Sequence, residues 1–209
     1  MARIRSMLGT IEGSAGGLTF ASQNGLNILR QKVGKNNSKT LPQQKVRNQF
    51  KALARLYTAG GSAFLSRGLL KQGGKSSYNR FVGENYGLAT SADALAVAAV
   101  DYTKLRLSSG AVLGVAGLVA TAAANSMSVA YTANADGASG LTTDKVTVVV
   151  MEKLTGKSYS ATGATRAAGP QVVAVPGLTA VGKAGYVVYA FFTRADGSDA
   201  SPTAYAVPA

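Results

Sequence analysis

Short apolar runs recur about every ten residues after residue 100, and turn-forming segments such as NADGASG and ADGSDAS separate them. The runs are KLRLS (104–108), AVLGVAG (111–117), SMSVAYTA (126–133), KVTVVVME (145–152), KSYSATGATR (157–166), QVVAVP (171–176), YVVYAFFTR (186–194) and PTAYAV (202–207). Short strands at this spacing are typical of antiparallel sandwiches. They predict an all-β, immunoglobulin/fibronectin-like domain. The KVTVVVM segment is apolar at consecutive positions, so we expect it to be a central strand.

Helical periodicity replaces this pattern earlier in the chain. Val46, Phe50, Leu53 and Tyr57 follow one another at spacings of four, three and four, which predicts one apolar stripe of an amphipathic helix. Thr40 is the expected N-cap of this helix. The Ala-Gly-Gly sequence that follows Thr58 is expected to end it.

Two shorter helices and a hairpin complete the predicted N-terminal region. The helices are expected over 62–71 and 76–87, the second with a Ser cap. Upstream, GLTFAS and GLNILRQK flank Gln-Asn-Gly, which is typical of a hairpin turn. We therefore predict an α+β protein with two domains: residues 1–98 hold a small basic β-hairpin and short helices, and residues 99–209 form the β-sandwich.

Positive charge is concentrated in the first part of the chain. Residues 1–90 contain 14 Lys and Arg against two acids, a net charge of +12, whereas residues 91–209 contain eight against seven, a net charge of +1. The segment 30–57 contains no acid. Its basic residues are Arg30, Lys32, Lys35, Lys39, Lys45, Arg47, Lys51 and Arg55.

These eight residues are the candidate contact site for a polyanion or an acidic partner. Arg47, Lys51 and Arg55 are spaced four apart, so on a helix they lie along one line, where like charges repel by a few tenths of a kcal/mol per pair. A flexible basic linker that leads into a basic helix suits a phosphate backbone. The alternative is a solvated helix face and a charged linker. No motif predicts reading of base sequence.

Catalytic and metal chemistry have little support in the composition. The chain has no His and no Cys, which removes the usual general base near neutral pH, the thiol nucleophile and the commonest metal ligands. Several acids stand in turn sequences, where Asp is expected for its backbone hydrogen bonds. For Arg166 we favour the end of a strand over a pair with an acid. We expect no enzymatic activity, no cofactor, no metal site and no small-molecule substrate.

The N-terminal sequence lacks the apolar region of a signal peptide. The longest apolar run, 111–124, is shorter than the roughly 20 residues that a membrane span needs. The expectation is a chain without a membrane partner.

Motifs along most of the chain resemble a family of unknown function found in Bacteroidota and their phages. They are GTIEGSAGGLTF (9–20), NGLNILRQKVGKNNSKTLPQQKVRNQF (24–50), DYTKLRLSSGAVLG (101–114), TDKVTVVVMEK (143–153), GATRAAG (163–169) and YVVYAFFTRADGSDASPTAY (186–205). The resemblance is weak over residues 58–98. It implies a structural protein and brings no enzymatic activity.

Two functions follow as hypotheses. The first is a virion component of a capsid, portal-associated ring or tail, assembled in the host cytoplasm and partnered by copies of itself and by other virion proteins. The second is a non-specific nucleic-acid-binding protein that uses residues 30–55 on the phosphate backbone. A carbohydrate-binding sandwich has little support, because the chain has no Trp and only 7% aromatic residues.

Overall fold

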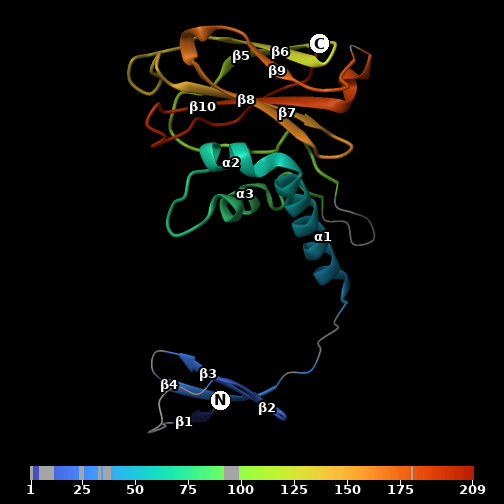
Figure 1. The fold of residues 1–209 in the computed structure, drawn as a ribbon, viewed down its shortest axis with the longest axis vertical. Coiled ribbons are helices and arrows are strands. Elements are labelled where there is room, and N and C mark those ends of the chain that lie inside the picture. The colour runs from blue at the N-terminus through green and yellow to red at the C-terminus, as the bar shows by residue number, and fades with distance from the viewer. Residues whose placement is uncertain are drawn as a thin grey trace. The chain divides into compact units, whose positions relative to one another are not determined.

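The computed structural model describes residues 2–4, 12–23, 26–32, 34, 39–91, 99–179 and 181–209. The chain divides into two compact units, residues 1–40 and residues 41–209. This division differs from the one expected near residue 98, because the helices pack on the sandwich and belong to the same unit. The class is α+β, as predicted (Figure 1).

The first unit is a small antiparallel sheet built around the predicted hairpin. Strands β3 (Leu18–Gln23) and β4 (Leu26–Gln31) pair from Leu18↔Gln31 to Gln23↔Leu26. Strand β2 (Gly13–Ala15) adds to β3 and β1 (Ala2–Ile4) adds to β4, so the strand order is β1-β4-β3-β2. The Asn-Gly turn of the hairpin lies outside the described residues.

The second unit contains one long, kinked helical segment and one separate short helix. Helix α1 (Leu41–Leu56) runs through a π-helical turn, η1 (Tyr57–Gly61), into α2 (Ser62–Gly68). The glycines after Thr58 therefore kink the helix instead of ending it: Gly60 has a φ of 129°, a conformation that only glycine adopts freely. Helix α3 (Ser77–Asn85) is separate. The predicted Ser cap is confirmed, since the Ser76 hydroxyl accepts a hydrogen bond from the Asn79 N–H.

Seven strands form the two antiparallel sheets of the predicted sandwich. One sheet has the order β11-β10-β7-β8 and the other β5-β6-β9. The strands are β5 (Ala116–Ala123), β6 (Ser126–Thr132), β7 (Lys145–Glu152), β8 (Ser158–Thr165), β9 (Gln171–Ala174), β10 (Tyr186–Thr193) and β11 (Ala204–Ala206). Strand β7 lies between β10 and β8, which confirms the prediction of a central strand.

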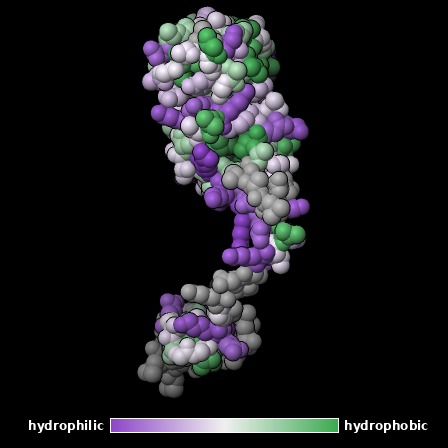
Figure 2. Space-filling view, turned by 90° about the vertical axis from the view of Figure 1, so that its right-hand side faces the viewer, coloured by the Kyte–Doolittle hydropathy of each residue, from purple (hydrophilic) through white to green (hydrophobic). Residues whose placement is uncertain are grey.

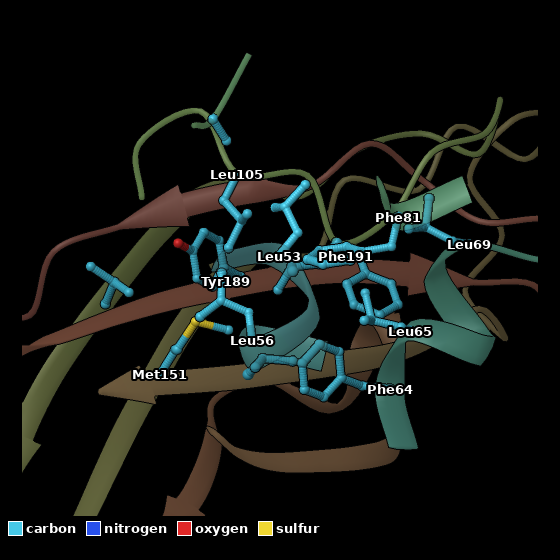
Figure 3. Close-up of a cluster of buried hydrophobic side chains, with 14 of the residues drawn as sticks. Leu53, Leu56, Phe64, Leu65, Leu69, Phe81, Leu105, Met151, Tyr189 and Phe191 are labelled. Carbon is cyan, nitrogen blue, oxygen red and sulfur yellow. The ribbon is translucent and has the colours of Figure 1, made fainter. Parts of the chain in front are cut away.

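The near-continuous apolar sequence of β7 and β10 follows from burial on both faces of their sheet. One face packs on β5, β6 and β9 and contributes Val148, Val188 and Phe192 to the core between the sheets. The other face packs on the helices (Figure 3). The unit therefore has three layers: helices, the β7–β10 sheet and the β5–β6–β9 sheet (Figure 1). The second core contains Leu53, Leu56, Phe64, Leu65, Leu69, Phe81, Leu105, Leu107, Met151, Tyr189 and Phe191.

Two strand predictions differ from the structure in this unit. The KLRLS segment, 104–108, is not a strand, although Leu105 and Leu107 are buried. Side chains satisfy its backbone: the Asn85 amide donates to the Arg106 carbonyl and accepts from the Arg106 N–H. The Thr203 hydroxyl accepts from the N–H groups of Leu107 and Ser108. The second β run begins at Ala116 and extends to Ala123, downstream of its predicted position.

Candidate polyanion-binding surface

Helix α1 buries a narrower face than its sequence predicts. The buried side chains are Gln49, Ala52, Leu53 and Leu56. Of the expected apolar stripe, Leu53 is fully buried and Tyr57 is half-buried, but Val46 and Phe50 are 41% and 42% exposed. The N-terminal part of α1 extends away from the two sheets (Figure 1), and the buried residues of the helix lie toward its C-terminal end. Phe50 instead stacks on Tyr86, with 5.2 Å between the ring centroids.

The basic side chains of α1 lie exposed on the surface. Arg47, Lys51 and Arg55 succeed one another at one-turn intervals, about 6 Å of helix rise apart, on the face turned away from the core. Figure 2 shows hydrophilic residues along this helix. Lys45 is also exposed, but the helical period places it on the side that faces the core further along α1. We call the line of Arg47, Lys51 and Arg55 the basic face.

No carboxylate of the described residues forms an ion pair with a side chain of the basic face. Helix α1 contains no Asp or Glu, so the three charges are not neutralised within the helix. Their mutual repulsion destabilises the helix slightly and is relieved when an anion binds. The surface is therefore suited to a polyanion whose charges are spread along a line.

The remaining predicted contact residues belong to the other unit or the segment after it. Arg30 is the second-last residue of β4 and is exposed. Lys32 is exposed just beyond the strand, where its N–H donates to the Gly17 carbonyl over 2.6 Å. Lys39 is exposed shortly before α1. Lys35 lies outside the described residues. The structure therefore brings together Arg47, Lys51 and Arg55 on α1, and the contact of all eight residues with one partner stays a prediction.

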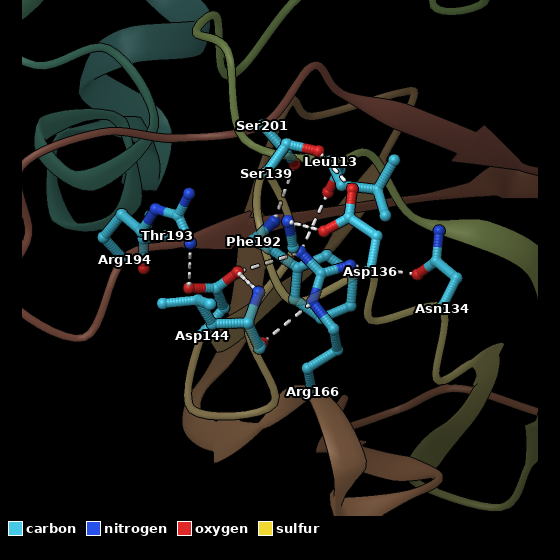
Figure 4. Close-up of polar contacts among 12 residues, drawn as sticks. Leu113, Asn134, Asp136, Ser139, Asp144, Arg166, Phe192, Thr193, Arg194 and Ser201 are labelled. Carbon is cyan, nitrogen blue, oxygen red and sulfur yellow. Dashed lines mark hydrogen bonds and ion pairs between the residues drawn. The ribbon is translucent and has the colours of Figure 1, made fainter.

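Arg166 is the charged residue whose environment the sequence prediction got wrong. It follows β8, as favoured, yet its side chain is completely buried and pairs with Asp144 (Figure 4). Its guanidinium lies 3.7 Å from the centroid of the Phe192 ring. Asp144 also pairs with Arg194, at 3.3 Å between Nη1 and Oδ1. Spacing along the chain could not reveal these pairs, because they join residues 22 and 50 positions apart.

Turn acids behave as the sequence predicts. The Asp136 carboxylate accepts hydrogen bonds from the Ser139 hydroxyl and from the N–H groups of Ala138 and Gly140. These bonds, led by that of the Ser139 hydroxyl, lower the pKa of Asp136 to about 2.

Across the described residues, no group of three or more His, Cys, Asp and Glu side chains is arranged to hold a metal ion. Within the same ranges, no helix has the length and apolarity that crossing a membrane requires.

Fold and surface together define a class of protein: an α+β chain whose β-sandwich carries a helical layer, with a line of unneutralised cations on its first helix. The model of the "Family of unknown function (DUF6266)" matches residues 10–206, so the chain belongs to that family. Comparison with curated proteins found no match, and neither did comparison with solved structures.

Proposed function

We propose that the protein is a structural, non-enzymatic component of an assembly made of copies of this chain, and that the assembly is a phage virion. The resemblance of its motifs to a family of Bacteroidota and their phages motivates the choice of a virion. The observation that carries the proposal is the separation of two surfaces in the second unit. One is the basic face, and the other is the outer face of the β5–β6–β9 sheet.

Strands β5, β6 and β9 contain no charged residue. Their outer face presents small and hydroxyl side chains around Val119 and Val172, which are 53% and 63% exposed. Burying a charge in an interface is costly unless it is paired. Copies that each carry a net charge of +13 repel one another, so they meet at the least cost where no cation is covered. We therefore assign this sheet face to contact with a second copy.

The experiment for the assembly is a measurement of mass in solution by light scattering, with electron microscopy of the same sample. We expect a defined oligomer for the natural sequence and a shift toward monomer for the double variant Val119→Lys/Val172→Lys. The matched control is Leu154→Lys/Val181→Lys, which adds the same charge at side chains that are 84% and 93% exposed in turns outside the sheet. A natural sequence that is strictly monomeric contradicts the proposal.

A second candidate function is favoured by the basic face: contact with the phosphate backbone of a nucleic acid. Each phosphate contact contributes nearly one unit to the slope of log K against log salt. We expect Arg47→Gln/Lys51→Gln/Arg55→Gln to reduce that slope by roughly 2 to 3 units. The control, Lys71→Gln/Lys75→Gln/Lys183→Gln, removes the same charge elsewhere and is expected to keep the slope. An unchanged slope in the first variant rules out the basic face as the contact.

A further inference from the structure

A second cationic site lies where α2 meets the start of β7 and the ends of β8 and β10. It is a pocket of about 510 Å³. Three basic side chains from three different elements line it: Arg67 in the last turn of α2, Lys145 at the start of β7 and Arg194 just after β10. They are 49 to 127 positions apart, so only the fold brings them together.

Strand pairing fixes the backbone positions at Lys145 and Thr193, and hydrogen bonds fix the side chain of Arg194. Lys145 pairs with Thr193 across β7 and β10, and the Thr193 hydroxyl donates to the Lys145 carbonyl over 3.3 Å. The Arg194 guanidinium donates two hydrogen bonds, one to Asp144 Oδ1 over 3.3 Å (Figure 4) and one to the Ala138 carbonyl over 3.0 Å. Its position is therefore set before any ligand arrives, which lowers the entropy lost on binding.

The pocket keeps an excess of positive charge despite these bonds. The Asp144 carboxylate that holds Arg194 also pairs with the buried Arg166, so one negative charge is shared by two guanidinium groups. Arg67 and Lys145 are exposed, and no carboxylate of the described residues forms an ion pair with either. Asp196 is the single acid among the lining residues. Its carboxylate accepts a hydrogen bond from the Ser198 N–H and interacts with the charge of Arg194, so it offsets part of the positive charge of the pocket, and the three cations still outnumber it.

From this geometry we infer that the pocket binds the phosphate group of a phosphate ester, with Arg67 and Lys145 as the groups that contact the oxygens. A guanidinium forms two parallel hydrogen bonds to a phosphate, and an ammonium adds a point charge. The Thr162 hydroxyl lines the same pocket and is a further donor. The volume lies within the range of small-molecule sites and exceeds what a lone phosphate fills. Leu70 offers an apolar wall to the rest of the ester.

The test is a titration of the full chain with inorganic pyrophosphate at constant ionic strength, followed by ¹H–¹⁵N NMR. We expect the amides of Gly163, Ala195 and Gly197, which line the pocket, to shift with saturation. The variant Arg67→Gln/Lys145→Gln is expected to bind pyrophosphate at least about tenfold more weakly, because it loses two charged donors. Both side chains are exposed, so the variant is expected to keep the dispersed spectrum of the folded chain.

Two control variants separate this site from non-specific attraction and from the basic face. Lys75→Gln/Lys183→Gln removes the same charge outside the pocket, and Arg47→Gln/Lys51→Gln/Arg55→Gln removes the basic face. Both are expected to bind pyrophosphate like the natural sequence. The inference is overturned if the pocket amides do not shift, if sodium chloride at equal ionic strength shifts them equally, or if the Lys75/Lys183 variant loses as much affinity as the pocket variant.

A final arm distinguishes a small phosphate ester from the backbone of a polynucleotide. Glycerol 3-phosphate and a single-stranded oligothymidylate are titrated separately. Saturation by glycerol 3-phosphate assigns the site to small esters, and shifts of the pocket amides by the oligonucleotide alone assign the phosphate to a polynucleotide. If neither compound shifts the pocket amides, the inference fails, whatever the basic face binds.

Discussion

Arg166 Nη2 donates a hydrogen bond to Asp144 Oδ2 over 3.1 Å, and neither side chain has any exposed surface. Three more N–H donors of the guanidinium are paired. Nη1 donates to Asn134 Oδ1, Nη2 to the Leu113 carbonyl and Nε to the Leu141 carbonyl, at 2.9 to 3.2 Å. A buried charge is tolerated only when its partner and its donors are provided for in this way. The pair joins the loops at one end of the sandwich and fixes their positions.

The first prediction concerns this pair. Asp144→Asn removes the negative charge and leaves the Arg166 cation buried without a counter-ion, so we expect a loss of about 3–5 kcal/mol in the free energy of unfolding. Urea denaturation measures it. The control is Lys104→Gln, which breaks the exposed 3.4 Å pair with Asp101 and is expected to change stability far less, because solvent screens an exposed pair. Equal effects of the two variants would contradict the role given to the buried pair.

A second prediction compares two glycines. A Cβ on Gly68 would collide with the Leu107 carbonyl oxygen and the Ser108 side chain, where α2 packs against the 104–108 segment. Gly68→Ala is therefore expected to destabilise the protein by about 1–3 kcal/mol. A Cβ on Gly83 in α3 meets no atom within 4 Å, so Gly83→Ala is expected to stabilise by about 0.5–1 kcal/mol. Thermal melting of both variants tests whether stability falls for Gly68→Ala and rises for Gly83→Ala. A higher melting temperature for Gly68→Ala would contradict the close approach of α2 to the 104–108 segment.

The third prediction concerns the start of α3. The Ser76 hydroxyl is 3.2 Å from the Asn79 nitrogen and satisfies one N–H that the first helical turn leaves unpaired. Ser76→Ala is expected to cost about 1 kcal/mol and Ser76→Gly only a few tenths. Chemical denaturation distinguishes the two values. If alanine is tolerated as well as glycine, the cap contributes nothing to stability.

A fourth prediction concerns how the free energy of unfolding changes at alkaline pH. Burial raises the pKa of Tyr189 well above its usual value of 10, and the Tyr189 hydroxyl donates to the Tyr102 carbonyl over 2.8 Å. The folded state holds the Tyr189 proton more tightly than the unfolded chain does. The contribution of the protonated hydroxyl to the free energy of unfolding is therefore complete below pH 10 and is lost as the pH rises above 10.

Tyr189→Phe is therefore expected to cost about 1 kcal/mol at neutral pH and to lose less stability than the natural sequence above pH 10. Urea denaturation at both pH values measures the difference. Parallel curves for the two proteins over the whole alkaline range would be inconsistent with a strongly raised pKa.

The amino-acid sequence by itself determined the local elements. Short apolar runs bounded by turn residues placed β7 at 145–152 and the later strands near their observed positions, and Ser76 marked the start of α3. The same local chemistry explains the turn at Asp136, where short-range hydrogen bonds are formed within four residues. These features depend on neighbours in the chain, so periodicity and residue type suffice to predict them.

Only the tertiary structure decided which apolar faces are covered and which charges are buried. Phe50 and Leu53 belong to one predicted stripe, yet only Leu53 is buried, because Leu53 packs in the core between the helices and the sheet whereas Phe50 contacts Tyr86 and stays 42% exposed. Leu105 and Leu107 are buried without forming a strand, since Asn85 and Thr203 replace the hydrogen bonds of a ladder. The pairing of Arg166 with Asp144 likewise depends on contacts between distant segments. Residue spacing carries no information on such contacts, because they form only when the layers pack.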